Sequence, residues 1–464
     1  MELGPEGAGS PATPAVGPEP AVPVLGTDLA FDELYSREGA LRLDAAFLAY
    51  LGAGAEELRG ALLAARSAPS TLEAKAESEL LIALAPHLED FLGTVFGIGG
   101  ELAALRQQHQ RLAPLYTVKR LFIQRRALKA YAEAAEFDGE ALREALEAAL
   151  DGPFSELLFA ERVTEWQKDD QANSKAIDLA LRFAAWASLA PEAHDLRKHG
   201  VLFRHPHKTD AAHLVPVATE MHGDVACLVL PQEERRQRAG FALTDRGTDL
   251  TGALDHANYC IWCHNQGKDS CSKGLREKSG AFKPNAFGAQ LTGCPLEERI
   301  SEMNLLKAEG HPLGALATVV VDNPMCAATG HRICNDCMKA CIFQKQDPVD
   351  IPQVETRVLK DVLALPFGFE IYSLLTRWNP LNLRRPVPKA PSGRTVLVVG
   401  LGPAGFTLSH HLMNDGHTVV AVDGLKIEPL APGLSGVAAD GTRVGFAPVR
   451  RIEDLREPLD DRAM

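Results

Sequence analysis

The sequence lacks several features that would assign it to a familiar class of protein. Its 464 residues contain no uninterrupted apolar run near the ~18 residues that a membrane-spanning helix requires, so no membrane span is expected. Acidic residues outnumber basic ones by 61 to 48, and the net charge of −13 argues against a nucleic-acid-binding surface. Nine cysteines are too few for a disulfide scaffold in a chain of this length.

The amino terminus has none of the marks of a targeting segment. The first basic residue is Arg37, and no apolar stretch follows Met1, so neither a secretory signal nor an Arg-rich presequence is expected. We therefore expect a cytoplasmic, reducing compartment, where clustered cysteines more often bind metal or do redox work than form disulfides.

The first half of the chain divides into two segments by composition. Residues 1–26 are rich in Pro, Gly and Ala and hold no aromatic side chain, which predicts a disordered arm. Residues 27–199 are rich in Ala, Leu, Glu and Arg and predict an α-helical domain. Leucines recur there at helical spacing, which indicates core-facing stripes: Leu81, Leu84, Leu88 and Leu92, with Pro86 as a candidate break or kink, and then Leu142, Leu146 and Leu150.

Residues 200–258 predict a small β-containing segment. Two β-rich runs, 213–219 and 225–230, flank a turn at His222, Gly223 and Asp224, and residues 241–244 are a candidate third strand. Cys227 is isolated and is expected to be a small core residue. Four histidines are interpreted as polar loop residues, because no carboxylates accompany them at metal-ligand spacing: His205, His207, His213 and His222.

The other eight cysteines lie between residues 260 and 341, in two groups of four. The first group is Cys260, Cys263, Cys271 and Cys294, and the second is Cys326, Cys334, Cys337 and Cys341. Each group contains a CxxC pair, which places two thiolates on one tight turn. The C-x2-C-x3-C run of the second group and the Cys-Pro step at Cys294 are similar to ferredoxin-type cluster loops.

These spacings favour two 4Fe-4S clusters. Zinc sites usually complete a CxxC pair with a second CxxC or CxxH, whereas here single cysteines complete it at uneven distances. Cys334, Cys337 and Cys341 are predicted to share one cluster and Cys260, Cys263 and Cys271 the other, with Cys294 and Cys326 assignable to either. Two structural zinc sites of four cysteines each remain the alternative. With the 4Fe-4S interpretation, residues 259–389 are predicted to form a helical, ferredoxin-like iron–sulfur domain with its linker.

A glycine motif follows in residues 390–464. The apolar run 395–399 leads directly into Gly400, Gly402 and Gly405, with Pro403 and Ala404 between the last two glycines. A helical stretch, 406–414, and a second apolar run, 418–422, then lead to Asp423, 21 residues after Gly402. This order is typical of a βαβ dinucleotide fingerprint, in which the glycines admit a pyrophosphate and the acid accepts a ribose hydroxyl.

A complete doubly wound nucleotide domain needs well over ~100 residues, and only 64 follow Gly400. No second GxGxxG is present, and the tail that contains the run 443–448 indicates a loop or hairpin. Residues 390–464 are therefore interpreted as an incomplete Rossmann-type FAD-binding domain.

The cysteine region and the VLVVGxGPAG run together resemble the glutamate synthase small subunit family, within the FAD-dependent pyridine nucleotide-disulfide oxidoreductases. Cys334, Cys337 and Cys341, followed by the D-I-P step at Asp350, are similar to that family's cluster motif. Its first, FAD-binding fingerprint is matched by Gly400, Gly402, Pro403, Ala404, Gly405 and Asp423. The long helical amino-terminal region and the missing NAD(P) domain depart from the family. The resemblance implies an amino-terminal portion of a longer protein.

The resemblance implies electron transfer between NAD(P)H, FAD and 4Fe-4S clusters in an NAD(P)-linked oxidoreductase. The expected partners are the nucleotide cofactor and either a redox protein or missing carboxy-terminal domains, with no nucleic acid and no membrane. Two alternatives remain open: a non-catalytic iron–sulfur electron-transfer or adaptor module, and a zinc-stapled structural protein. No catalytic acid, base or nucleophile can be named, because no substrate pocket is readable in the sequence.

Overall fold

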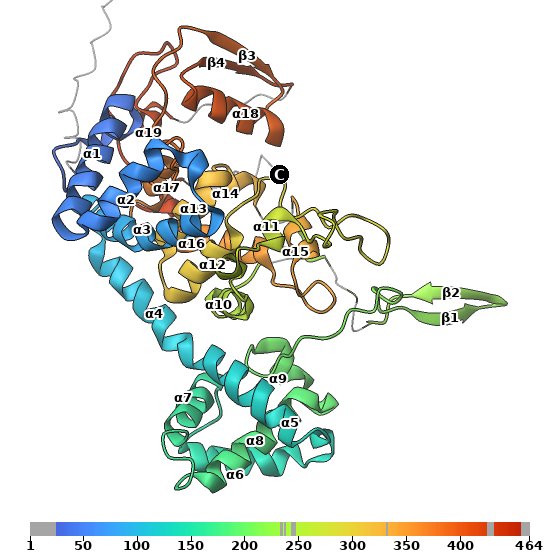
Figure 1. Ribbon diagram of the computed structural model, residues 1–464. Helices are drawn as coiled ribbons and strands as arrows, with labels where there is room; N and C mark the ends of the chain where they lie inside the picture. The colour runs from blue at the N-terminus through green and yellow to red at the C-terminus, as the bar shows by residue number, and fades with distance from the viewer. Residues whose placement is uncertain are drawn as a thin grey trace, which may run out of the picture.

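The computed structural model describes residues 25–232, 235, 238–242, 247–330, 333–424 and 431–455. The arm predicted for residues 1–26 lies outside this range except for Leu25 and Gly26. Figure 1 shows a body of packed helices, a second helical unit attached to it through α4, a projecting hairpin and a βαβ unit at the top. Across the described residues, no helix is both long and apolar enough to cross a membrane.

The amino-terminal helices form the first part of the body. They are η1 (Phe31–Tyr35), α1 (Arg37–Gly54), α2 (Glu56–Ser67), η2 (Pro69–Thr71), α3 (Ala74–Val95) and α4 (Gly99–Thr117). Ser36 caps α1 by accepting a hydrogen bond from the Gly39 amide at 2.9 Å. The predicted leucine stripe of α3 is fully buried, and the helix continues through Pro86 without a break.

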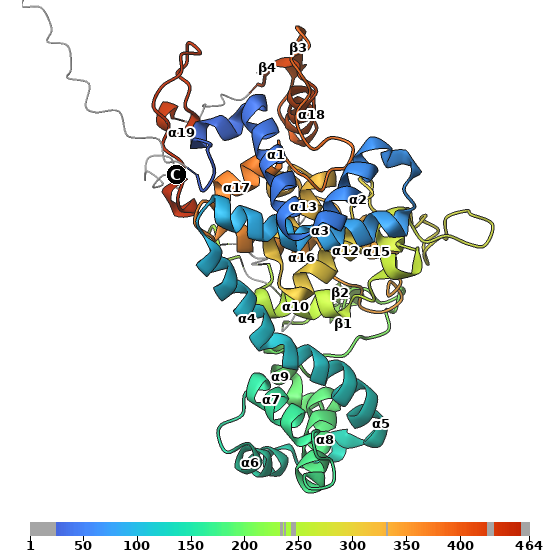
Figure 2. The same cartoon turned by 60° about the vertical axis from the view of Figure 1, so that its left-hand side comes forward.

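Helix α4 joins the body to the second helical unit. Its backbone continues through the π-helical segment η3 (Val118–Ala127) into α5 (Leu128–Ala130), so one helical rod runs from Gly99 to Ala130 (Figure 2). Leu102 belongs to the core of the body, whereas Phe122 belongs to the core of the second unit. The remaining helices of that unit are η4 (Ala134–Glu136), α6 (Gly139–Leu150), α7 (Glu156–Trp166), α8 (Ser174–Leu189), η5 (Pro191–Ala193) and α9 (His194–His199).

The described residues form two hydrophobic cores, which we call the first core and the second core. The first core combines residues 25–102 with residues 260–383 and Phe446, and α3 packs directly against α13 (Pro312–Asp322). The second core lies within residues 115–203, with Leu254 added, and contains a cluster of phenylalanine rings. The helices predicted as one domain over 27–199 are therefore divided between two cores, because the apolar face of α3 is covered by helices from the cysteine region.

The predicted hairpin is present with shifted boundaries. Strands β1 (Ala218–His222) and β2 (Val225–Val229) pair antiparallel, with Ala218 opposite Val229 and Gly223 in the turn at φ +64°. The hairpin projects from the body, and its residues are exposed or half-buried. Phe241 and Ala242 lie in a turn, so the strand predicted at 241–244 does not begin there, and residues 243 and 244 lie outside the described residues.

Short helices and loops make up the cysteine region, which completes the body. The helices are α10 (Leu250–Tyr259), η7 (Cys263–Gln266), α11 (Ser270–Lys273), α12 (Ile300–Glu309), α13, α14 (Cys326–Thr329), α15 (Asp336–Ala340), α16 (Ile351–Leu363) and α17 (Gly368–Leu375). Asp350 of the D-I-P step caps α16 through the Gln353 amide at 3.4 Å.

Buried charges tie the helices of this body together. Lys307 of α12 and Asp361 of α16 form an ion pair in which both side chains are fully buried. Lys307 Nζ also donates to His109 Nε2 of α4 at 2.8 Å, and Arg357 Nε donates to Asp361 Oδ1 at 2.6 Å. Burial and the charge of Lys307 lower the pKa of His109 to about 4, so its neutral ring accepts this hydrogen bond.

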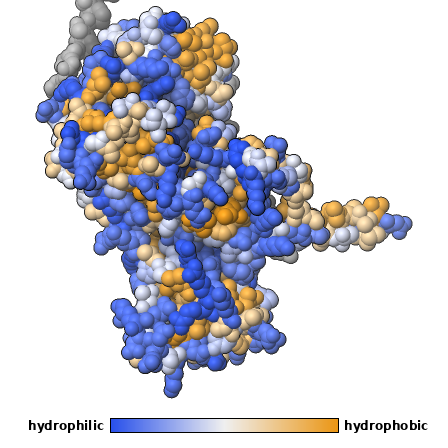
Figure 3. All heavy atoms as spheres, viewed as in Figure 1, coloured by the Kyte–Doolittle hydropathy of each residue, from blue (hydrophilic) through white to orange (hydrophobic). Residues whose placement is uncertain are grey.

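The carboxy-terminal part forms a βαβ unit. Strands β3 (Thr395–Val399) and β4 (Thr418–Val422) pair in parallel, with Thr395 opposite Thr418, and α18 (Pro403–Asn414) connects them. Leu397, Val399, Val420 and Val422 are exposed. Figure 3 shows an apolar surface at the top of the molecule, where Figure 1 places this unit. The described tail contains α19 (Pro432–Ser435), an antiparallel bridge between Val437 and Arg443, and η8 (Ile452–Leu455), in agreement with the predicted loop or hairpin.

Candidate functional site: the cysteine groups and the glycine turn

The two CxxC segments share one hydrogen bond to sulfur. Cys260 ends α10, and the amide of Trp262, two residues later, donates to Cys260 Sγ at 3.4 Å. In the second segment, the amide of Asp336 donates to Cys334 Sγ at the same distance. Trp262 has a φ of +52°, a left-handed conformation that turns the chain back toward Cys260. Amide hydrogen bonds to sulfur stabilise a thiolate, so both turns suit cysteines that bind a metal centre as anions.

Cys341 lies with the first three cysteines, although it is the last of the eight in the chain. A hydrogen bond with Cys271 and the amides of Phe343 and Val349 lower the pKa of Cys341 to about 7, against the opposing effect of burial. The same bond raises the pKa of Cys271. Cys341 also contributes to the raised pKa values of Cys260 and Cys263, which requires it to be close to both. The contact of α11 with α15 brings these segments together.

Cys294 lies instead with the second CxxC segment. Burial, followed by the charge of Cys294, raises the pKa of Cys337. Cys326 shares two neighbours with them, because Glu298 and Glu355 raise the pKa values of all three thiols. Cys334 is exposed and is joined to this group by the CxxC turn. In space, the first cysteine set is therefore Cys260, Cys263, Cys271 and Cys341. The second cysteine set is Cys294, Cys326, Cys334 and Cys337. This division differs from the prediction that Cys341 stays with Cys334 and Cys337.

Burial governs the chemistry of these thiols. Cys260, Cys271, Cys326, Cys337 and Cys341 are buried, Cys263 and Cys294 are half-buried, and none of these cysteines forms a disulfide. Burial raises the pKa values of Cys260 and Cys326 to about 12 and those of Cys263 and Cys294 to about 11. Such thiols stay protonated at neutral pH unless a bound cationic centre compensates their charge. The chemistry of the donor set and its amide hydrogen bonds suits a centre held by cysteine thiolates.

A single-ion site is not formed by the residues that the structure describes. Among them, no three His, Cys, Asp or Glu side chains converge closely enough to hold one metal ion. The four histidines of the β-containing segment form no such site. The rings of His205 and His207 are tilted against each other with centroids 4.6 Å apart, His213 Nδ1 lies 2.7 Å from Asp210 Oδ2, and His222 Nε2 lies 3.7 Å from Glu220 Oε2. Cys227 is half-buried on the projecting hairpin, so the expectation of a core cysteine is wrong, because the hairpin packs against no core.

Each glycine of the motif has a distinct steric role. Gly400 has φ +94°, a conformation that favours glycine, and its amide donates to Val422 O at 2.7 Å. A Cβ on Gly405 would lie 1.8 Å from Gly400 O, so only glycine lets α18 approach the turn this closely. A Cβ on Gly402 would meet nothing within 4 Å, and Gly402 is the N-cap of α18. The turn therefore leaves an open space at a helix amino terminus, where a phosphate is favoured.

The remaining predicted residues of the motif lie at the same end of the βαβ unit. Pro403 and Ala404 form the first turn of α18, three residues before the predicted helix start. Asp423 follows β4, and its Oδ2 accepts a hydrogen bond from the Leu401 amide at 2.5 Å. The acid and the glycine turn are thus adjacent, as the fingerprint requires.

Sequence reasoning missed the acidic and phenolic groups around the second cysteine set. The Tyr372 hydroxyl lies 3.8 Å from Cys326 Sγ and donates to Pro324 O at 2.7 Å. Glu298 and Glu355 are buried nearby, and burial raises the pKa values of both. Tyr372 is 46 residues from Cys326 in the chain, so no local spacing signals the contact.

Comparisons with known proteins give partial matches of several kinds. Residues 25–97 match the RP005 N-terminal alpha-helical domain family. The uncharacterized protein RP006 of Rickettsia prowazekii is 64% identical over 107 residues, which cover 23% of this chain and 15% of RP006. The glutamate synthase [NADPH] small chain of Mycobacterium tuberculosis is 33% identical over 132 residues, which cover 28% of this chain and 24% of that protein. The chain therefore spans only a small part of these two relatives. No solved structure matches the chain.

The similarity to the glutamate synthase small chain is partial, and it points to an oxidoreductase. A more extensive match is to the uncharacterized protein RP005 of Rickettsia prowazekii. It is 32% identical over 301 residues, which cover 61% of this chain and 98% of RP005. By this coverage, the chain belongs to the RP005 family.

Proposed function

We propose that this chain is part of an oxidoreductase that passes electrons between NAD(P)H, FAD and two 4Fe-4S clusters. The observation that carries the proposal is the exchange of cysteines between the two sequence groups. Cys341 lies with Cys260, Cys263 and Cys271, and Cys294 lies with Cys337. The same exchange of the last cysteine occurs in two-cluster ferredoxins, and two independent zinc staples would not need it.

The cysteine sets divide the ligands between the two centres. Cys260, Cys263, Cys271 and Cys341 hold one cluster, and Cys294, Cys326, Cys334 and Cys337 hold the other. When bound, each cluster supplies one-electron transfer. The amides of Trp262 and Asp336 stabilise the thiolate form of their cysteines, and burial of the first set excludes water. Exposure of Cys334 brings the second set to the surface, where a redox partner can approach.

The glycine turn holds the FAD pyrophosphate in this proposal. The open space at Gly402 admits the phosphates, the amino-terminal end of α18 faces them with its positive dipole, and Asp423 accepts a ribose hydroxyl. The parallel strand pair and the partial similarity to a glutamate synthase [NADPH] small chain support this assignment. We assign NAD(P)H as the electron donor on the basis of the same partial similarity.

Paired cysteine substitutions test the ligand division. Cys337→Ser and Cys341→Ser should each remove about half of the iron from anaerobically purified protein, and the double variant should remove nearly all of it. Cys271→Ser combined with Cys341→Ser should lose no more iron than either single variant, because both cysteines serve one cluster. Cys227→Ser is the matched control and should lose none. If Cys337→Ser with Cys341→Ser lost only half, Cys341 would belong with Cys337 and the division would be wrong.

Gly402→Val tests the flavin site separately. The valine side chain projects into the open space at the turn, so we expect loss of FAD binding with an unchanged circular dichroism spectrum and iron content. Gly433→Val, in the exposed α19, is the control, since a Cβ there also meets nothing within 4 Å. Equal FAD affinity in both variants, measured by flavin fluorescence quenching, would place the nucleotide elsewhere.

A further inference from the structure

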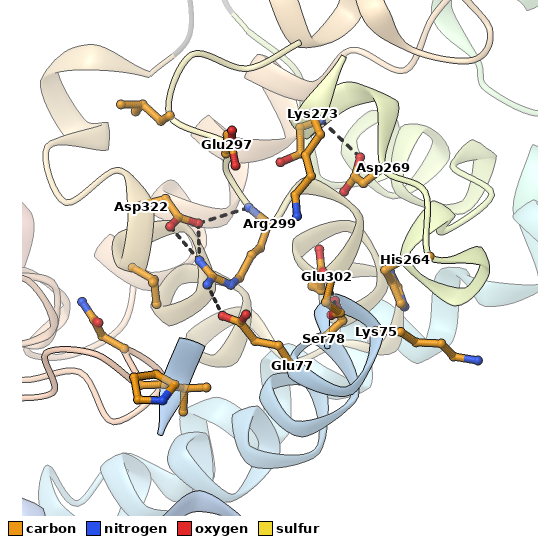
Figure 4. A pocket seen from close by; sticks show the side chains of 18 of the residues that line it. Lys75, Glu77, Ser78, His264, Asp269, Lys273, Glu297, Arg299, Glu302 and Asp322 are labelled. Atoms are coloured by element: carbon orange, nitrogen blue, oxygen red, sulfur yellow. Dashed lines mark hydrogen bonds and ion pairs between the residues drawn. The ribbon is translucent and has the colours of Figure 1, made fainter. Parts of the chain in front are cut away.

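A polar cavity of about 520 Å³ lies beside the first cysteine set. Its walls come from α3, the segment from η7 to α11, the chain leading into α12, the end of α13 and residues 382–384. Figure 4 shows charged side chains from these elements directed toward one another across the cavity. This volume falls within the range of small-molecule sites.

One wall of the cavity is made of charged groups that pair with one another. Arg299 Nη1 donates to Asp322 Oδ1 at 2.6 Å, and Arg299 Nη2 pairs with Glu77. Both contacts appear as dashed lines in Figure 4. The arginine holds both carboxylates in hydrogen bonds, so this wall, with a net charge of −1, provides shape and leaves recognition to other groups.

Two buried polar groups of the lining have unused hydrogen-bonding atoms. Glu302 of α12 is 4% exposed, and its Oε1 accepts from Ser78 while its Oε2 has no partner. His264 is also 4% exposed, and its Nδ1 lies 2.6 Å from Ser301 Oγ while its Nε2 has no partner. Buried polar atoms in native proteins are normally paired, so two unpaired atoms in the lining of one cavity indicate a missing ligand.

Positive charge lies at the mouth of the same cavity, where Asp269 is a nearby acid to Lys273. Lys268 and Lys273 line it, are exposed, and form no ion pair with any residue that the structure describes. In Figure 4, Lys273 extends from α11 toward Glu302. The cavity thus offers a buried carboxylate at one place and exposed ammonium groups at another.

We propose that this cavity binds a small zwitterion of the α-amino acid class. The ligand's ammonium group donates to Glu302 Oε2 and to His264 Nε2, in the tautomer whose Nδ1–H donates to Ser301. Its carboxylate pairs with Lys273 and Lys268. A metal ion does not fit the same groups, since no three ligating side chains converge among the described residues. This assignment does not depend on the clusters or the flavin.

Isothermal titration calorimetry of the full, anaerobically purified chain with the standard L-amino acids tests the site. We expect at least one to bind, and we expect its decarboxylated amine and its deaminated acid to bind roughly tenfold more weakly or worse. Glu302→Gln should weaken binding of that amino acid roughly ten- to hundredfold. Glu309→Gln, on the exposed face of the same helix, is the matched control and should not change it.

A second pair of variants covers the case in which Glu302→Gln does not fold. Lys273→Gln at the cavity mouth should weaken binding of the amino acid but leave binding of the matching amine unchanged, whereas exposed Lys278→Gln should affect neither. Absence of binding by every amino acid would overturn the proposal. Equal binding of the zwitterion and either single-ended analogue would also overturn it, because the site would then recognise only one charge.

Discussion

The two cores of this chain are built from different kinds of side chain. The second core packs rings against one another, with Phe154, Phe159, Phe183 and Phe203 in mutual contact. Within the described part of residues 115–203, Ser188 is the one polar residue that is buried. The first core instead encloses cysteines, carboxylates, a lysine and two histidines.

This difference separates the parts of the molecule that provide shape from those that provide chemistry. Burying a charge costs free energy unless it is paired, so an apolar core is the simpler way to stabilise a helical domain. The first core nevertheless contains the Lys307–Asp361 pair, Glu89 paired with Arg106, and the acids beside the second cysteine set. We infer that the first core carries the chemistry and that the second core is a structural extension mounted on α4.

Breaking the buried pair of the first core should have the largest effect on stability. Lys307→Met leaves Asp361 with only Arg357 as a charged partner, and we expect the free energy of unfolding to fall by about 3–5 kcal/mol. Lys360→Met, an exposed lysine of α16, is the control and should stay within about 0.5 kcal/mol. Urea unfolding followed by circular dichroism measures both. If Lys307→Met lost no more free energy of unfolding than Lys360→Met, the buried pair would not hold the helices together.

A cavity in the second core should destabilise only that unit. Phe183→Ala removes a fully buried ring that contacts three other phenylalanines, so we expect a loss of about 3 kcal/mol. Leu121→Ala, at a position 45% exposed, should cost less than about 1 kcal/mol. Hydrogen exchange should rise in residues 115–203 and remain unchanged around the cysteines. Increased exchange throughout the body would contradict the independence of the two cores.

A pH titration gives a smaller effect within the first core. Burial raises the pKa of Glu370 to about 7, although its Oε1 accepts from the Val449 amide at 2.6 Å. The folded state then holds this proton more tightly than the unfolded state. The contribution of Glu370 to the free energy of unfolding is therefore full at low pH and is lost as pH rises from about 4.5 to 7. We expect a loss of about 3 kcal/mol across this window.

Glu370→Gln keeps the acceptor for Val449 and removes the charge. Chemical unfolding between pH 5 and pH 8 should therefore show a flatter profile for Glu370→Gln than for the unchanged protein, after the pH dependence common to both is subtracted. Identical profiles would show that Glu370 does not titrate differently in the folded state.

The sequence was most informative where spacing reflects local geometry. The leucines of α3, the hairpin turn at Gly223 and the order of β3, α18 and β4 were all predictable, because each depends on residues close together in the chain. The steric need for glycine at Gly400 and Gly405 also follows from local backbone geometry.

Long-range packing was not predictable in the same way. The Leu stripe of α3 indicated a buried face but not that α13 covers it. Spacing also favoured keeping Cys341 with Cys337, whereas the contact between α11 and α15 brings Cys341 to Cys271. The cavity at Glu302 combines residues from five parts of the chain, and no short pattern marks it.

The metal and sulfide content of the chain tests the central claim most directly. Protein purified without oxygen should contain about eight iron atoms and about eight acid-labile sulfides per chain, with the broad visible absorption of 4Fe-4S clusters. Elemental analysis and sulfide determination on one sample provide both values. Stoichiometric zinc without sulfide would contradict the account and make the eight cysteines structural ligands.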